Sequence, residues 1–142
     1  MQLGDYRLAD EQIEVALALA TATGSQMFRA MVLSERAEVR ARSGNIEAAH
    51  AMLLEIEAID TSGTWWLVTS TTHALSPWFL RTEAEVRARL SEANAFLQGV
   101  APGMIGVLFH LRAADASLER GFEDIAKEQA GLALGLLQDG AM

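Results

Sequence analysis

A short frame of residues recurs three times along the chain, and this recurrence constrains the fold more than any other feature. In each copy a glycine is followed five positions later by an alanine: Gly4 and Ala9, Gly44 and Ala49, Gly121 and Ala126. Apolar residues follow four and seven positions beyond each alanine (Ile13, Leu53 and Ala130; Ala16, Ile56 and Ala133). The second interval between the glycines is nearly twice the first, so it holds two units. Such a period, near 40, predicts repeated helix pairs.

The segments between the glycines have the composition and periodicity of α-helices. Alanine and leucine, both strong helix formers, account for 25 and 19 of the 142 residues. In the first segment Ile13, Leu17 and Ala20 recur at helical spacing. Glycines 24, 44 and 121 are expected to end helices, because glycine adopts the left-handed conformation found there. The sequence therefore predicts an all-α protein of antiparallel helix pairs, with a closed α-helical bundle as the alternative.

The middle of the chain departs from this pattern. Ser76 is expected to cap a helix that begins at Pro77 and reaches Leu90, with Leu90-Ser91 in place of the glycine turn. Ser91 would then cap a short helix to Gln98, before a turn over 99–103. The alternative is one long helix from Trp65 to Leu90, kinked at Pro77. We expect a single domain, residues 1–142, of about three and a half helix pairs: a partial unit 1–24, then 25–62, an irregular 63–100, and 101–142.

At the glycine and alanine frame the chain resembles the tetratricopeptide repeat (TPR) family. Leu33 and His110 stand where that family usually has tryptophan. The period near 40 is longer than the basic unit of that family and is similar to that of MalT-like and large LuxR-type bacterial regulators. The resemblance implies a short right-handed α-solenoid that acts as a non-enzymatic protein-protein interaction scaffold in a bacterial signalling or transcription-regulatory protein.

The resemblance also implies a concave groove lined by the first helix of each pair. In the second unit the frame places Met31, Ser34, Glu38 and Arg42 there, and in the last unit Leu108, Leu111, Asp115 and Glu119. Such a mixed groove suits a peptide with a basic or apolar side chain. The three tryptophans, Trp65, Trp66 and Trp78, point to an alternative function, a regulatory domain that senses a small molecule in a pocket beside them.

The sequence contains no motif that indicates catalysis or cofactor binding. The absence of cysteine excludes disulfides, thiol nucleophiles and cysteine-bound metals, and no glycine-rich phosphate loop is present. Glu47 and His50 have the Glu-x-x-His spacing of di-iron bundles, but such a centre needs a second copy, and neither His73 nor His110 has an acid three positions before it. We therefore expect no enzyme, no cofactor and no metal site.

The net charge and the hydropathy of the chain indicate which classes of partner it binds. The net charge of −8 argues against nucleic acid, and no apolar run approaches the length that spans a membrane. A cytoplasmic protein that binds a protein or peptide, or adjoining domains of a larger protein, is expected. A truncated repeat array leaves its end helices uncovered. The apolar residues concerned would be Ile13, Val15 and Leu17 at one end and Leu132, Leu136 and Leu137 at the other, and they make a homodimer through an end helix possible.

Overall fold

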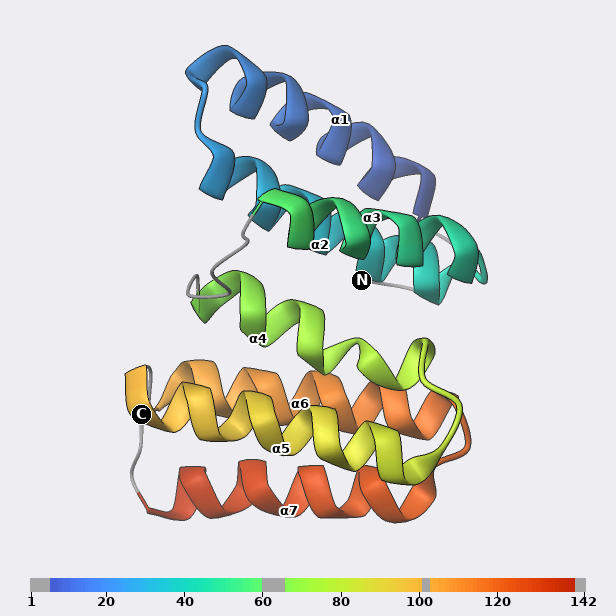
Figure 1. Cartoon of the computed structure of the whole chain (residues 1–142), viewed down its shortest axis with the longest axis vertical. Helices are drawn as coiled ribbons and strands as arrows, with labels where there is room; N and C mark the ends of the chain where they lie inside the picture. Colours follow the sequence, from blue (N-terminus) through green and yellow to red (C-terminus); the bar gives the residue numbers. More distant parts are fainter. Residues whose placement is uncertain (1–5, 60–65, 101–102, 140–142) are drawn as a thin grey trace. The chain divides into compact units, whose positions relative to one another are not determined.

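The computed structural model describes residues 6–59, 66–100 and 103–139, and it confirms the all-α prediction (Figure 1). Within these residues every regular element is helical and no strand occurs. The elements are α1 (Tyr6–Thr23), α2 (Gln26–Arg42), α3 (Ile46–Ile59), α4 (Trp66–Ala74), the short 3₁₀ helix η1 (Ser76–Trp78), α5 (Glu83–Val100), α6 (Met104–Glu119) and α7 (Glu123–Gln138).

The period seen in the sequence is present in the helix boundaries, including those in the middle of the chain. Helices α1, α3, α5 and α7 begin at Tyr6, Ile46, Glu83 and Glu123, which are nearly evenly spaced. Helices α2, α4 and α6, which begin at Gln26, Trp66 and Met104, have almost the same spacing. Among the described residues the helices therefore recur with a common period along the sequence.

Two glycine turns that are far apart in the sequence have the same hydrogen bonds. In the first, the backbone N–H of Asn45 donates to the carbonyl of Arg40 at 2.8 Å; in the second, Phe122 donates to Ser117 at 2.8 Å. The glycine before each donor, Gly44 or Gly121, has a φ of 90° or 79°. This closure is the Schellman motif, which places a left-handed residue just past the helix end. The predicted role of both glycines is confirmed.

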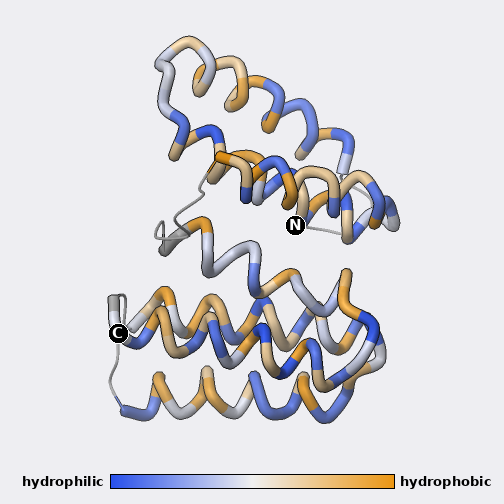
Figure 2. The backbone as a smooth tube through the Cα atoms, viewed as in Figure 1, coloured by the Kyte–Doolittle hydropathy of each residue, from blue (hydrophilic) through white to orange (hydrophobic). Residues whose placement is uncertain are grey.

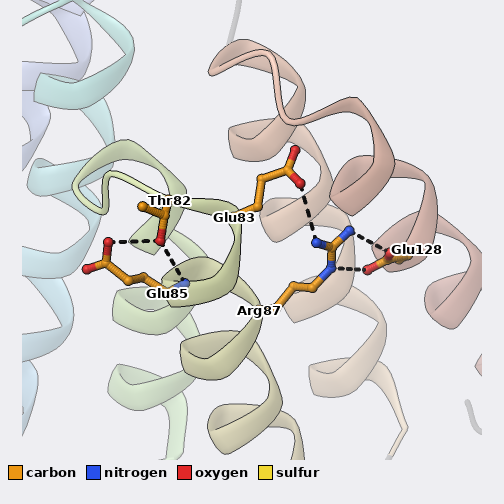
Figure 3. Close-up of polar contacts among 5 residues, drawn as sticks. All are labelled: Thr82, Glu83, Glu85, Arg87 and Glu128. Carbon is orange, nitrogen blue, oxygen red and sulfur yellow. Dashed lines mark hydrogen bonds and ion pairs between the residues drawn. The ribbon is translucent and has the colours of Figure 1, made fainter.

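The expectations for residues 76–98 were wrong in three respects. Pro77 belongs to η1 and does not begin a long helix; α5 begins instead at Glu83, so a kinked helix through Pro77 is also excluded. Helix α5 continues through Leu90 and Ser91 without a turn. The start of α5 is set by Thr82, whose hydroxyl oxygen accepts a hydrogen bond from the Glu85 backbone N–H at 3.2 Å and donates one to the Glu85 carboxylate at 2.9 Å (Figure 3). The signal for this start was the Thr-x-x-Glu pattern of a capping box.

The chain groups into two compact units, residues 1–68 and 69–142, with the boundary inside α4. In the first unit α2 packs against both α1 and α3. Arg36 and Arg40 of α2 form ion pairs with Glu14 and Asp10 of α1, and Arg29 pairs with Glu55 of α3 at 2.8 Å. The buried apolar residues of these helices are Ala20, Ala30, Val32, Leu33, Ala37, Val39, Ala41, Ala49, Leu53 and Ile56.

In the second unit α6 packs against α5, α7 and η1. One apolar core joins the helices, and its buried members are Ala74, Val86, Leu90, Ala93, Leu97, Phe109, Ala113 and Ile125. Along these helices hydrophobic residues are interspersed with hydrophilic ones (Figure 2). Arg120, just past α6, donates to the carbonyls of Pro77 and Trp78 at 2.8 and 2.6 Å and so ties η1 to the end of α6.

Candidate interaction surface

The most exposed apolar surface on a single helix of the second unit is a stripe along α6. Met104, Leu108, Leu111 and Leu118 are between 42% and 61% exposed. Their spacing puts all four on one side of the helix, with Asp115 between the last two. The opposite side of α6 is buried and carries Phe109 and Ala113 of the core. We call these four residues the α6 stripe.

The α6 stripe includes two of the groove residues expected from the sequence and adds two that were missed. Leu108 and Leu111 were expected; Met104 and Leu118 were not, although the heptad spacing 104, 111, 118 is readable in the sequence. Asp115 is half-buried and Glu119 is exposed at the C-terminal end of the same helix. Three of these expected groove residues therefore lie on the surface of α6, and Asp115 lies partly on it.

The corresponding residues of α2 lie differently. Ser34 is buried, and its hydroxyl donates to the carbonyl of Met31 at 2.7 Å, so it presents no group to a ligand. Met31 is half-buried. Glu38 and Arg42 form an ion pair with each other at 3.3 Å, and their side chains are only 14% and 26% exposed. In α2 the same positions of the frame thus offer far less apolar surface than in α6.

The expected pocket beside the three tryptophans falls partly outside the described residues. Trp65 and the side chain of Trp66 lie outside the described residues. Trp78 is half-buried in η1, and its indole N–H is buried without a hydrogen-bond acceptor among the described residues. The described cavities are lined by other residues.

An open cavity of about 280 Å³ lies between α5, α6 and α7. Much of its wall is backbone, because four of its residues are glycines, and a methyl group at Gly106 would approach Cδ1 of Leu136 to 3.1 Å. The lining residues are Asn94, Gln98, Gly103, Gly106, His110, Gly131, Leu132, Gly135, Leu136 and Asp139. Sequence reasoning did not find this cavity, because its residues come from three helices and share no local pattern.

His110 is one of the residues that line this cavity. It is 2% exposed, and its Nδ1 and Nε2 lie 2.7 Å from Oε1 of Gln129 and 3.1 Å from Oδ1 of Asn94. Burial lowers the pKa of the imidazole below its ordinary value, against an opposing effect of the Gln129 hydrogen bond, so the ring is neutral at pH 7. A neutral imidazole carries one N–H, so one of the two amides must turn its NH₂ group to the ring. The ring is thus held between two amides, which makes it a fixed hydrogen-bonding group.

The charged cluster of the second unit is exposed and joins two helices. Arg87 of α5 donates to both carboxylate oxygens of Glu128 of α7, at 3.2 and 2.9 Å, and contacts Glu83 at 3.4 Å (Figure 3). These hydrogen bonds raise the pKa of Arg87 and lower that of Glu128. Exposed pairs of this kind contribute little to stability because water and salt screen them. The cluster orients α5 and α7 and offers no chemistry of its own.

The described residues contain neither a metal-binding cluster nor a membrane-spanning helix. Among the described residues, no three His, Asp or Glu side chains lie close enough together to hold a metal ion. No described helix has both the length and the apolar character to cross a membrane. Comparison of the chain with family models, with curated proteins and with solved structures finds no match. The α6 stripe and the cavity are therefore the two candidate sites.

Proposed function

We propose that the chain is a non-enzymatic interaction module that binds an amphipathic helical segment of another protein along the α6 stripe. The observation that carries the proposal is the exposure of four large apolar side chains on one side of one helix, three of them (Met104, Leu111 and Leu118) at heptad spacing. Single exposed leucines are common on proteins, but a continuous row is typical of a surface that another helix covers. The spacing of the row favours a helix because heptads align with a helical partner along the full length of the contact.

The repeated helix pairs support the wider proposal of a TPR-like scaffold. The helix starts recur at nearly even intervals, and the two glycine turns have the same hydrogen bonds. We propose a right-handed solenoid over a closed bundle, and a role in a cytoplasmic bacterial regulatory protein, on the basis of this period and of the resemblance at the glycine and alanine frame. The acidic net charge of −8 suits a partner segment with basic residues beside its apolar row.

A displayed library of amphipathic helical peptides, selected on the full chain, tests this function. We expect clones whose binding, measured by fluorescence anisotropy, falls at least about tenfold in the double variant Leu108→Ser, Leu111→Ser, since apolar anchors dominate such contacts. Leu54→Ser, which changes an equally exposed leucine of α3, is the matched control and should bind as the native chain does. Selected clones that bind both variants and the native chain equally would refute the proposal.

The cavity favours a second candidate function, the sensing of a small molecule. Its volume lies just below the range of about 300–1,000 Å³ that is usual for ligand pockets. Asn94, Gln98 and His110 contribute neutral polar side chains to its lining, and Asp139 contributes a carboxylate. The site differs from the one expected at the tryptophans. Gly131→Ala adds a methyl group to its wall without a clash, so a metabolite that raises the melting temperature of the native chain should do so less in this variant. A metabolite panel that shifts neither protein would count against sensing.

A further inference from the structure

Two of the helices that begin a repeat interval, α1 and α5, use the same three positions to contact the helix that follows them. Counted from the helix start, these are the eighth, twelfth and fifteenth positions: Ile13, Leu17 and Ala20 in α1 and Leu90, Asn94 and Leu97 in α5; the same positions of α7 hold Ala130, Leu134 and Leu137. The spacing of four and three positions places each set on one side of its helix. We call this side the following-helix face.

In α5 the following-helix face is covered by α6. Leu90 and Leu97 are buried in one core with Phe109 and Ala113 of α6. Between them, Oδ1 of Asn94 lies 3.1 Å from Nε2 of His110, also on α6.

In α1 the same face lies against α2. Asp10 and Glu14, which flank Ile13 on that side of the helix, form ion pairs with Arg40 and Arg36 of α2. Ala20 is buried, and Ile13 and Leu17 are half-buried. In both α1 and α5 this face therefore lies against the helix that follows. The polar contact at the fifth position differs: Asp10 of α1 pairs with α2, whereas Arg87 of α5 pairs with Glu128 of α7.

In α7 the same face is exposed. Ala130 is exposed, and Leu134 and Leu137 are 55% and 45% exposed. Lys127, which stands where α1 has Asp10, is exposed as well. The side of α7 that belongs to the core is a different one, which carries the buried Ile125, Ala126 and Ala133.

We propose that the following-helix face of α7 is a docking surface for one more amphipathic helix, which packs on it as α6 packs on α5 and α2 on α1. The repeat itself indicates the occupant, because two copies of the face are already covered by such a helix. Lys127 indicates the charge of the docking helix. Asp10 of α1 pairs with Arg40 near the C-terminal end of α2, so the opposite sign at Lys127 favours a helix with an acidic residue near its C-terminal end. This surface is distinct from the α6 stripe.

The test uses the full chain and a labelled peptide that copies residues 103–120, which contain α6. Position 117 of the peptide corresponds to Arg40, because the carbonyls of Ser117 and Arg40 accept the equivalent hydrogen bond in the two glycine turns. We expect the peptide with Ser117→Glu to bind about fivefold more tightly than the peptide with Ser117→Lys, and Lys127→Glu in the protein to reverse that order. Fluorescence anisotropy measures both affinities.

Matched leucine variants distinguish binding at this surface from nonspecific binding to exposed apolar residues. Leu134→Asp should weaken binding of the Glu peptide at least about tenfold, whereas Leu54→Asp, which changes a leucine of α3 that is 54% exposed, should leave it unchanged. Leu137→Asp serves as a second variant, and circular dichroism confirms that each variant is folded. Peptide affinities that are unchanged by Leu134→Asp and by Lys127→Glu would overturn the proposal. So would a native chain that dimerises in light scattering and becomes monomeric in Leu134→Asp, because the occupant would then be a second copy.

Discussion

His110 shows how a single residue acquires a role from its surroundings. The ring is enclosed between amide side chains from α5 and α7 and lies edge-on to Phe109, with ring centroids 5.0 Å apart. An enclosed neutral imidazole resists protonation because the charged form would lose its hydration. His73 resembles it: burial, together with the nearby Arg89, lowers its pKa, while its hydrogen bond to the Thr69 carbonyl acts in the opposite direction.

The lowered pKa of His110 predicts that the protein loses stability as the pH falls below about 6.5. Below that value the unfolded chain binds a proton that the folded chain does not, so protonation favours unfolding until the folded pKa is reached. Above it both states are neutral at this position, and the contribution is constant. Urea unfolding between pH 7.5 and 5.5 should show a steeper loss in the native chain than in His110→Gln. Equal slopes in the two proteins would contradict the assignment.

At the scale of the element, conformational preference determines what each glycine does. Gly121 ends α6 in a left-handed conformation with a φ of 79°, whereas Gly131 lies inside α7 with open space around it. Substitution of glycine by alanine should therefore change the free energy of unfolding in opposite directions at the two positions. A residue with a side chain is strained in the left-handed region. In a helix interior, by contrast, alanine is more stabilising than glycine, because an unfolded chain with alanine has less conformational entropy to lose on folding.

We expect Gly121→Ala to lower the free energy of unfolding by about 1–2 kcal/mol. Gly131→Ala should raise it by about 0.5–1 kcal/mol. Chemical denaturation of the two variants beside the native chain measures both changes. An unchanged or raised free energy of unfolding in Gly121→Ala would show that the turn at Gly121 does not require its backbone conformation, and a lowered one in Gly131→Ala would contradict the prediction for the helix interior.

At the scale of the whole molecule, each of the two compact units contains buried apolar residues. Phe109 lies in the core that joins α5, α6 and α7, and Leu33 lies among the buried residues of α2. Truncation of a large buried side chain costs about 2–5 kcal/mol, because apolar contacts are lost and a cavity remains.

Phe109→Ala should therefore reduce amide hydrogen-exchange protection more in α5, α6 and α7 than in α1, α2 and α3. Leu33→Ala should produce the reverse pattern. The comparison is internal, because each variant serves as the control for the other. Loss of protection spread evenly from α1 to α7 in both variants would show that the units unfold as one.

The sequence was sufficient for most of the properties that depend on near neighbours along the chain. Helical periodicity, the alanine content and the turn glycines predicted the all-α class, and the ends of α1, α2 and α6 follow from Gly24, Gly44 and Gly121. The start of α5 was missed although its capping signal, Thr82 to Glu85, is equally local. That error came from the preference of proline for a first helical turn, which the short helix η1 already satisfies.

Only the tertiary structure decided which copies of a repeated position are exposed. Ser34 and Leu111 occupy the same place in the frame, yet Ser34 is buried and Leu111 is exposed. The cavity beside His110 likewise depends on three helices that are distant in sequence. Burial depends on what packs against a residue, whereas helix formation and helix ends depend on neighbours a few positions away. The sequence alone therefore determined the helices and their period, and the packing of those helices determined the surfaces available for binding.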